Sequence, residues 1–294
     1  MKIKINKRII SQKSSTYFIA DIAANHDGDL KRAKKLIKLC AKNGANAAKF
    51  QHFKAETIVL DEGFKKIGKI SHQKKWKKSV FEVYKEASIN PEWTKILHKE
   101  SKKHNIDFLT APYDLEYVDE VNRYIPAYKI GSGDITWKEI IIKIAKKNKP
   151  VLIACGASTL KETVNAVNAI LRFNKKVILM QCNTNYTNEL TNLNFINLKS
   201  LNKFKKIFKN KVLLGLSDHT PGHASVLGAI AMGARVIEKH FTDDNSRLGP
   251  DHKFSMNPKT WSEMVVASRQ LEKCFGDGEK KIEKNEQQSV IVQR

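Results

Sequence analysis

The sequence has no long hydrophobic run. Nowhere in its 294 residues is there an uninterrupted apolar stretch of about 18 residues, the length that a membrane-spanning helix needs. The basic residues at the start, within 1–13, lead into polar residues and lack the apolar core of a signal peptide. We therefore expect a soluble protein of the cytoplasm that binds no membrane.

Closely spaced cysteines are also missing. The four cysteines are far apart in the chain and show none of the CxxC or CxxH spacings of zinc sites and redox motifs. They lie in apolar surroundings, where cysteine usually behaves as a small hydrophobic residue. This argues against a disulfide framework and agrees with a reducing compartment. The four are Cys40, Cys155, Cys182 and Cys274.

Arginine is scarce, although the chain is strongly basic. Only 8 of the 53 basic residues are arginine, and the formal net charge is +23. Proteins that read nucleic-acid bases or grip phosphates in two-point contacts favour arginine, whereas the lysines here are spread along the whole chain. We interpret the charge as a lysine-rich solvated surface that attracts small anionic substrates, and we expect no nucleic-acid partner.

A dinucleotide-binding glycine motif is absent as well. No GxGxxG follows the first strand-like run, which argues against a Rossmann-type domain. What is present is a repeated alternation of short apolar runs and longer amphipathic stretches. Eight such pairs match the order and size of a (β/α)8 TIM barrel, although a doubly wound open sheet has the same local pattern. The predicted strands are 16–24, 46–51, 107–111, 127–132, 151–155, 177–182, 212–217 and 235–241.

Capping residues mark where helices begin between these strands. Each precedes an amphipathic stretch and offers a side-chain oxygen to the first helical amides. They are Asp29, Asn90, Thr159 and Asn257. One segment, residues 52–90, interrupts the rhythm of strands and helices and is rich in lysine. Its aromatic residues, Trp76, Phe81 and Tyr84, suggest a lid or a substrate wall.

Polar side chains gather where the predicted strands end. The active site of a TIM barrel is built at the carboxyl ends of its strands, so polar residues at these positions indicate chemistry. The pattern recurs around the predicted ring. The residues are Asp21, Lys49, Gln51, Thr110, Lys129, Ser132, Asp134, Asn183, Thr184, Tyr186, Ser217, His219, Glu238 and His240.

Two lysines, Lys49 and Lys129, lie within apolar strands, where an uncompensated ammonium group is costly. They can be snorkelling or salt-bridged side chains. Alternatively, two lysines facing one barrel mouth, beside the glycine-rich turn at 131–133, form a cradle for a phosphate or carboxylate. We favour the cradle.

Two histidines, His219 and His240, follow or end adjacent predicted strands. They can be metal ligands on one side of the mouth, with Mn, Mg, Fe or Zn all suited to two nitrogen ligands and open positions. Either can instead be a hydrogen-bonded structural residue. The carboxylates Asp21 and Glu238 are partners of these groups or act as acid–base groups. Asp218 is expected to cap its loop, and Arg247 and Asp251 lie where they can reach a substrate.

Several segments carry a more specific resemblance. IADIAANHDGDL, AAKFQ, IPAYKIGSGD, GLSDHTPGHA and VIEKHFTDDNSRLGPDHKFSMNP occur in this order between residue 16 and about residue 282. Together they resemble the sialic acid synthase family, whose members make N-acetylneuraminate and the related legionaminic and pseudaminic acids. The last of the five is the most specific.

The resemblance implies a condensation of phosphoenolpyruvate with the open-chain aldehyde of an N-acyl-hexosamine, which releases inorganic phosphate. It also implies a divalent cation, usually Mn, held by His219 and His240. Of the other matching positions, those of Asp21, Lys49, Gln51 and Glu238 are taken as catalytic. The remaining matches are taken as substrate-binding: Thr110, Lys129, Ser132, Asp134, Asn183, Thr184, Tyr186, Ser217 and Asp251.

The sequence departs from the family pattern at several of these positions. Asp21 and Asp134 stand where glutamate is common, which keeps the charge and shortens the side chain by one methylene. Ala111 replaces a threonine that helps to bind phosphoenolpyruvate, and Thr184 aligns with a binding asparagine. These changes bear on which acyl-sugar is used.

Family members usually continue into a small antifreeze-like domain that reaches across a dimer to the partner's sugar site. On the resemblance we expect a barrel over residues 1–282, a linker remnant over 283–294, no antifreeze-like domain, and a homodimer. The missing domain and Ala111 leave an alternative, a catalytically weakened barrel that still binds phosphoenolpyruvate or sugar. A synthase acting on a phosphorylated sugar would need a second phosphate site, and no further arginine cluster is seen for one.

Overall fold

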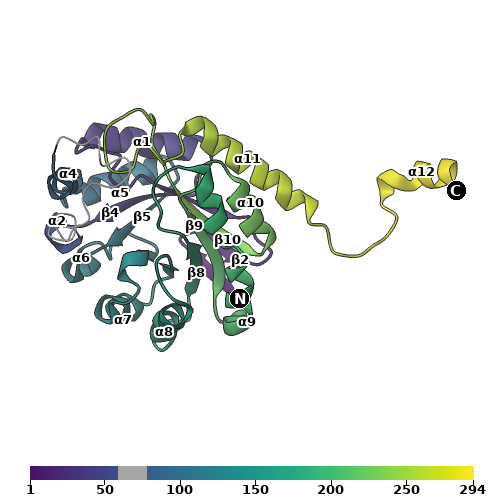
Figure 1. The fold of residues 1–294 in the computed structure, drawn as a ribbon, viewed down its shortest axis with the longest axis horizontal. Helices are drawn as coiled ribbons and strands as arrows, with labels where there is room; N and C mark the ends of the chain where they lie inside the picture. Colours follow the sequence, from purple (N-terminus) through teal and green to yellow (C-terminus); the bar gives the residue numbers. More distant parts are fainter. Residues whose placement is uncertain (59–77) are drawn as a thin grey trace.

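A computed structural model describes residues 1–58 and 78–294 of the chain. Within that part, eight parallel strands close into a barrel, each strand pairing with its neighbours in chain order and the last with the first (Figure 1). Closure excludes the open doubly wound sheet, and all eight predicted strands are confirmed. They are β3 (Tyr17–Asp21), β4 (Ala47–His52), β5 (Asp107–Pro112), β6 (Tyr128–Ile130), β7 (Val151–Ala154), β8 (Val177–Cys182), β9 (Leu213–Asp218) and β10 (Ala234–His240).

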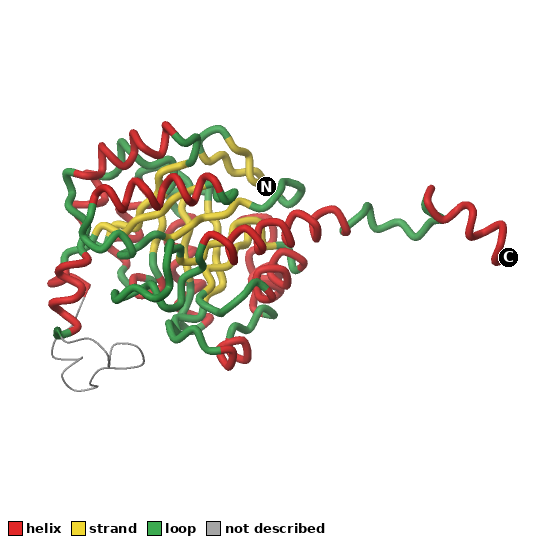
Figure 2. The backbone as a smooth tube through the Cα atoms, turned by 90° about the horizontal axis from the view of Figure 1, so that it is seen from above, coloured by secondary structure: helices red, strands yellow, loops and turns green. Residues whose placement is uncertain are grey.

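Helices surround the barrel (Figures 1 and 2). The described α-helices are α1 (Leu30–Lys42), α2 (Ala55–Ile58), α4 (Val80–Ala87), α5 (Trp93–Lys103), α6 (Leu115–Glu120), α7 (Lys138–Lys146), α8 (Leu160–Leu171), α9 (Ser200–Phe208), α10 (Ala224–Ala231), α11 (Pro258–Cys274) and α12 (Gln287–Gln293). Short 3₁₀ turns are η2 (Ser132–Asp134), η3 (Leu190–Phe195), η4 (Lys209–Lys211) and η5 (Lys284–Glu286). No helix of the described residues is long and apolar enough to cross a membrane.

Three of the four predicted helix caps are confirmed. The side chains of Asp29, Thr159 and Asn257 accept hydrogen bonds from the first amides of α1, α8 and α11. Asn90 was the wrong choice for α5, because its side chain accepts from Glu92 N at 3.0 Å and so closes the turn before the helix. Glu92 occupies the cap position of α5 without a side-chain bond.

Side chains in each barrel strand alternate between the barrel interior and the helix layer, as the two-residue period of a strand requires. In β3, Tyr17 and Ile19 belong to the apolar cluster inside the barrel, whereas Phe18 and Ala20 belong to the cluster beneath the helices. Both faces are buried, so these strands are largely apolar on both faces, apart from polar residues near their carboxyl ends. The same alternation decides which polar residues can meet inside the barrel.

A two-stranded hairpin precedes the barrel and was not predicted. β1 (Lys2–Ile5) and β2 (Arg8–Ser11) pair antiparallel, and Ile3, Ile5 and Ile10 pack against inward-facing residues at the start of the barrel strands. The hairpin therefore closes the amino-terminal end of the barrel. The alternation of charged and apolar residues around a short turn was the signal for it.

The interrupting segment after β4 is described at its two ends. α2 and α4 pack against each other there, with Phe81 and Tyr84 on α4. Trp76 lies outside the described residues. At the other end of the chain, α11 is followed by an exposed stretch, and α12 lies away from the barrel (Figures 1 and 2). The domain boundary at residue 282 and the linker remnant stay predictions.

Replacing Ile10 by alanine should lower the free energy of unfolding by about 2 to 4 kcal/mol, because it leaves a cavity where the hairpin closes the barrel. Ile9→Ala, on the same strand but 58% exposed, is the matched control and should change stability by less than about 0.5 kcal/mol. Chemical unfolding of both variants measures the difference. Equal effects would mean that the hairpin does not close the barrel in solution.

Candidate active site

The strand register brings several predicted residues together at the carboxyl end of the barrel. His240 of β10 pairs with Asp21 of β3, and Asp21 pairs with Lys49 of β4. On the other side of β10, Glu238 pairs with Ser217 of β9. Residues at neighbouring positions on one face of paired strands lie close enough to interact. These five side chains therefore form a contiguous floor.

Lys129 of β6 also belongs to this floor, through its contact with Glu238, and four buried charges dominate the floor. Lys49 Nζ lies 2.7 Å from Asp21 Oδ2 and 3.9 Å from Glu238 Oε1. Lys129 Nζ lies 3.0 Å from the same Glu238 oxygen. The four side chains are almost fully buried, so the lysines do not snorkel to solvent. They are salt-bridged, and the anion cradle formed by the two lysines stays a prediction.

Neutral polar groups complete the contacts of these carboxylates. Gln51 Nε2 donates to Asp21 at 3.3 Å, and Ser217 Oγ donates to Glu238 at 3.2 Å. The second oxygen of Glu238, Oε2, is buried and has no hydrogen-bond partner among the described residues. A buried carboxylate oxygen without a donor is costly. The floor thus retains an open acceptor.

The two carboxylates differ in their tendency to stay ionised. Burial would raise the pKa of Glu238, but Lys129 and Lys49 outweigh it and lower that pKa to about 2. For Asp21, burial dominates and raises the pKa. Burial would lower the pKa of Lys49, yet Asp21 and Glu238 raise it. Glu238 is thus a permanent negative charge, whereas Asp21 is the carboxylate better suited to take up a proton.

His219 lies beside His240 at the edge of this floor. Their ring centroids are 5.4 Å apart, and His240 Nε2 is 3.6 Å from Asp21 Oδ2. Burial and the neighbouring imidazole lower the pKa of His219 to about 3, and burial and Lys49 lower that of His240 to about 3. Both rings are therefore neutral at neutral pH, with a lone pair each.

The tautomer of His219 follows from its partner. Its Nδ1 lies 2.7 Å from the carbonyl oxygen of Asn183, which can only accept, so Nδ1 carries the proton and Nε2 keeps the lone pair. Nδ1 of His240 is buried without a partner among the described residues. Two neutral imidazoles with uncommitted nitrogens fit a divalent cation with open positions. No cluster of three or more His, Cys, Asp or Glu side chains suited to a metal occurs in the described part of the chain.

Asp218 lies on the opposite face of β9 from Ser217. Its carboxylate accepts from Thr220 N at 3.1 Å and from Ser225 Oγ at 2.6 Å, and it is paired with the buried Lys239. Asp218 points to the helix layer, away from the barrel interior. The prediction that it caps its loop is confirmed.

A cavity of about 730 Å³ opens above the floor. Of the predicted residues it is lined by Gln51, Ser132, Asn183, Thr184, Tyr186, His240 and Asp251. The η2 turn, which contains Ser132, lies close to the loop after β7: Gly156 N of that loop donates to Ser132 Oγ at 2.9 Å. A Cβ at Gly156 would lie 2.6 Å from Thr184 Cγ2, so this approach requires glycine.

One wall of the cavity is aromatic, and most of it was not singled out as part of the site from the sequence. Phe53, Tyr84, Tyr113 and Phe254 line it together with Tyr186. Tyr84 comes from α4, which supports the expectation that the segment after β4 supplies a wall. Phe254 lies 4.9 Å from the His240 ring, centroid to centroid. Its position within the segment HKFSMNP was the available signal.

Eight of the predicted site residues do not line the cavity. Six of them belong to the floor or lie beside it: Asp21, Lys49, Lys129, Ser217, His219 and Glu238. The other two are Thr110 and Asp134, and the alternation within strands explains the position of Thr110. Thr110 points to the helix layer, where its hydroxyl bonds His52 Nδ1 at 2.8 Å, so its expected contact with substrate is wrong. Ala111 is the inward residue of β5. Asp134 lies in η2 but does not line the cavity, and burial raises its pKa to about 6. Arg247, also expected to reach substrate, instead binds Asp27 at 2.8 Å.

Comparisons with known proteins agree with this geometry. The NeuB family model matches residues 36–280. N,N'-diacetyllegionaminic acid synthase of Campylobacter jejuni is 39% identical over 284 residues, which are 95% of this chain and 83% of that protein. Pseudaminic acid synthase of the same organism is 33% identical, over 89% of this chain and 75% of that protein. The crystal structure of an N-acetylneuraminic acid (sialic acid) synthetase from Leptospira borgpetersenii matches with a TM-score of 0.85 and 27% identity, over 100% of this chain and 96% of that one.

A closed parallel barrel with buried lysines and neutral histidines at its carboxyl end defines a TIM-barrel enzyme. The family model and the relatives, which match most of the chain, identify it more specifically than the fold does. This chain belongs to the NeuB family, and the resemblance to sialic acid synthases is confirmed.

Asp251 should make stability depend on pH. Burial raises its pKa from 3.8 to about 7, although Ala24 N donates to its carboxylate. The stability that the neutral carboxyl provides is fully present below the unfolded pKa and is lost as pH rises through about 7. The melting temperature of Asp251→Asn minus that of the wild type should therefore increase from pH 5 to pH 8.

Asp243→Asn is the control for this pH series. Burial would raise the pKa of Asp243, but Lys35 and Arg32 lower it to about 2, so its loss should destabilise the protein equally at pH 5 and pH 8. Thermal melts of the ligand-free proteins measure both differences. An Asp251→Asn difference that is flat over this range would contradict the raised pKa.

Proposed function

We propose that this enzyme condenses phosphoenolpyruvate with the open-chain aldehyde of an N-acyl-hexosamine and releases a nonulosonic acid and inorganic phosphate. One observation carries the proposal: two buried lysines and two neutral imidazoles lie together at the carboxyl end of the barrel, where His240 also lines the cavity. The lysines suit an anionic substrate, and the imidazoles suit a cation. The relatives named as legionaminic and pseudaminic acid synthases support the same reaction class.

Lys49 and Lys129 would hold the phosphate and carboxylate of phosphoenolpyruvate, with hydroxyl groups of Ser132 and Ser217 beside them. Because both lysines are fixed by carboxylates before substrate arrives, little reorganisation is needed when the anion binds. The lysines would position C3 of the enol toward the aldehyde. Positioning of this kind supplies much of the rate in two-substrate condensations.

His219 and His240 would hold a divalent cation, and Mn²⁺ is the one we expect. When bound, such a cation polarises the sugar carbonyl as a Lewis acid. The carbonyl of Asn183 fixes the proton of His219 on Nδ1, so Nε2 would be the nitrogen that holds the cation. Burial of both rings keeps them neutral, which is the form that ligates metals.

The remaining steps are a carbon–carbon bond between C3 and the aldehyde carbon, addition of water at C2, and departure of phosphate. Positive charge develops at C2, and the permanent negative charge of Glu238 lies beside the lysines that hold the substrate. Asp21, whose pKa is raised by burial, would orient the attacking water and accept its proton. Gln51 would fix Asp21 through its 3.3 Å hydrogen bond.

The acceptor sugar would lie against the aromatic wall. Phe53, Tyr84 and Phe254 give apolar surface for an N-acyl group, and Tyr186 and Asp251 give polar groups for hydroxyls. An apolar pocket with a few polar groups is the usual design of a site for such a ligand. A homodimer and a cytoplasmic location stay predictions.

Phosphate release tests the reaction. The purified protein should release phosphate only when Mn²⁺, phosphoenolpyruvate and an acceptor are all present. The acceptors to compare are N-acetylmannosamine and diacetamido sugars of the manno and altro series. Release without an acceptor, or none with any acceptor, would favour the alternative of a catalytically weakened barrel.

His219→Ala should remove both Mn²⁺ binding and turnover, because it deletes one of two nitrogen ligands. Binding is measured on the ligand-free protein by the electron paramagnetic resonance of free Mn²⁺, and folding by circular dichroism. His223→Ala is the matched control, since His223 lies four residues on and makes no capping bond for α10. Full Mn²⁺ binding by a folded His219→Ala protein would contradict the assignment.

A further inference from the structure

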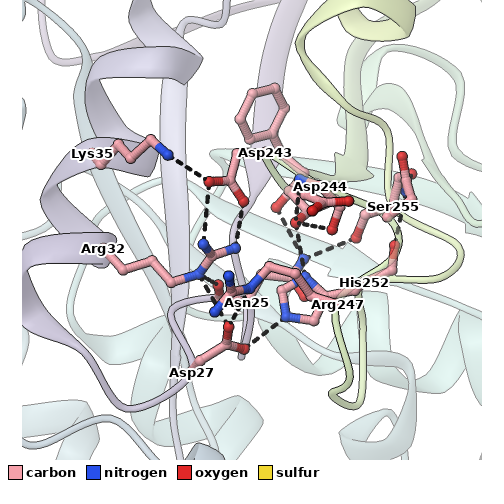
Figure 3. Close-up of polar contacts among 12 residues, drawn as sticks. Asn25, Asp27, Arg32, Lys35, Asp243, Asp244, Arg247, His252 and Ser255 are labelled. Atoms are coloured by element: carbon pink, nitrogen blue, oxygen red, sulfur yellow. Dashed lines mark hydrogen bonds and ion pairs between the residues drawn. The ribbon is translucent and has the colours of Figure 1, made fainter.

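The loop after β10 is fastened to the loop after β3 by a network centred on Asp27 (Figure 3). Asp27 Oδ1 lies 2.7 Å from His252 Nε2, and Oδ2 accepts from Arg247 Nε at 2.8 Å. Arg32 of α1 approaches the same carboxylate at 3.2 Å and also binds Asp243 with both terminal nitrogens. One carboxylate thus joins three basic side chains, two from the loop after β10 and one from α1.

The backbone around Asp27 is shaped to make these contacts. Asp27 itself has a positive φ of 52°, a conformation that Asp and Asn adopt more readily than most residues. His252 is fully buried, and its Nδ1 lies 2.8 Å from Thr242 Oγ1, so both ring nitrogens are engaged. A Cβ at Gly249 would lie 2.7 Å from His252 Cδ2, so the loop passes the ring closely only because this residue is glycine.

Charge strengthens the same contacts. Burial would raise the pKa of Asp27, but His252 and Arg247 outweigh it and lower that pKa. The carboxylate is therefore ionised at neutral pH, and charge-assisted hydrogen bonds of this type are stronger than neutral ones. Asn25 also connects the two loops: its Nδ2 donates to Phe241 O at 3.0 Å and to Ser255 Oγ at 2.9 Å.

The fastened loop carries part of the cavity wall. Asp251 immediately precedes His252 and Phe254 follows it by two residues, and both line the cavity. Asp251 Oδ2 also accepts from Ala24 N at 3.2 Å, which joins the two loops at the cavity edge. His252 therefore points away from the cavity to Asp27 while its neighbours face the cavity.

The side of the site that carries Lys129 and Ser217 is independent of this network. Lys129 and Ser217 project from β6 and β9 and are held by Glu238. Within the described part of the chain, the side-chain contacts of Asp27 do not reach these strands. A change at Asp27 should consequently act on one side of the cavity only.

We propose that Asp27 is a positioning residue for the acceptor-sugar side of the active site. It touches no substrate, and it holds the segment 242–256 so that Asp251 and Phe254 form the wall against which the sugar binds. This inference rests on the proposed function, because it assigns that wall to the sugar.

Steady-state kinetics of Asp27→Asn tests the inference. Asparagine keeps the shape and the backbone preference and removes the charge, so the loop should loosen without unfolding the barrel. The KM for the acceptor sugar should rise about tenfold, as for other residues that act through a directly binding group, while the KM for phosphoenolpyruvate should stay near its wild-type value. A purely structural loss would change neither KM, or both together.

Asp119→Asn is the matched control. Asp119 also joins two basic side chains, Lys143 and Lys147, but it does so between α6 and α7 on the outside of the barrel. Its loss should leave both KM values unchanged. An equal rise in the sugar KM for Asp119→Asn would overturn the specific role of Asp27.

Gly249→Ala approaches the network from the other loop. The added methyl group must displace the His252 ring from Asp27, so this variant should reproduce the sugar-selective effect even if Asp27→Asn folds poorly. In the double variant of Asp27→Asn and Gly249→Ala the two effects should not multiply, because both act through one contact. Fully multiplied effects would show that Asp27 acts by another route.

Hydrogen exchange separates this inference from the proposed function. In ligand-free protein, Asp27→Asn should speed the exchange of amides in 242–256 and leave those of β6 and β9 protected. Unchanged exchange in 242–256 would overturn the positioning role whatever the reaction is. A wild-type protein that condenses no acceptor sugar, with faster loop exchange in the variant, would overturn the proposed function and its sugar assignment while leaving the fastening of the loop in place.

Discussion

Lys49 and Lys129 can lie inside the barrel as ammonium ions only because carboxylates lie beside them, since an unpaired buried charge costs several kcal/mol. Asp21 and Glu238 provide these partners from the strands on either side of the closure. The inward alternation of β3, β4, β6 and β10 brings the four charges to one level. Without that alternation the polar residues of the strands would face different layers of the protein.

The balance of these charges limits what the site can bind. The four side chains sum to zero, so a multiply charged anion entering the floor must share the lysines with two carboxylates. A divalent cation at His219 and His240 would restore a positive balance beside the anion. On the proposed function, metal and phosphoenolpyruvate therefore support each other's binding electrostatically, although each is held by different side chains.

The sequence was sufficient for the barrel and for most of its floor. Apolar runs of strand length survive as strands because each is buried on both faces, and strand ends necessarily meet at the carboxyl end of a closed barrel. What could not be predicted is which of two neighbouring buried residues faces inward. Thr110 and Ala111 are both fully buried, and hydrophobicity does not distinguish the two faces of such a strand.

Loop residues were harder to place, because their partners lie far away in the chain. The guanidinium group of Arg247 is suited to binding an anionic substrate. In the structure it binds Asp27 instead, which lies 220 residues earlier in the chain. Asn90 has the chemistry of a helix cap, but the chain makes one further turn before α5 begins. Local signals specify what a residue can do, and only the fold decides whether a partner is within reach.

The two sides of the cavity are held by different kinds of structure. Lysines, Glu238 and both histidines stand in or directly after barrel strands, whose backbone is fixed by pairing on both sides. The aromatic wall comes from loops and from α4, and side-chain contacts such as those of Asp27 hold it in place. Substitutions at the strand positions disturb the barrel, whereas substitutions among the loop contacts leave the barrel intact. The fold is thus suited to keeping one anion chemistry while the acceptor sugar varies.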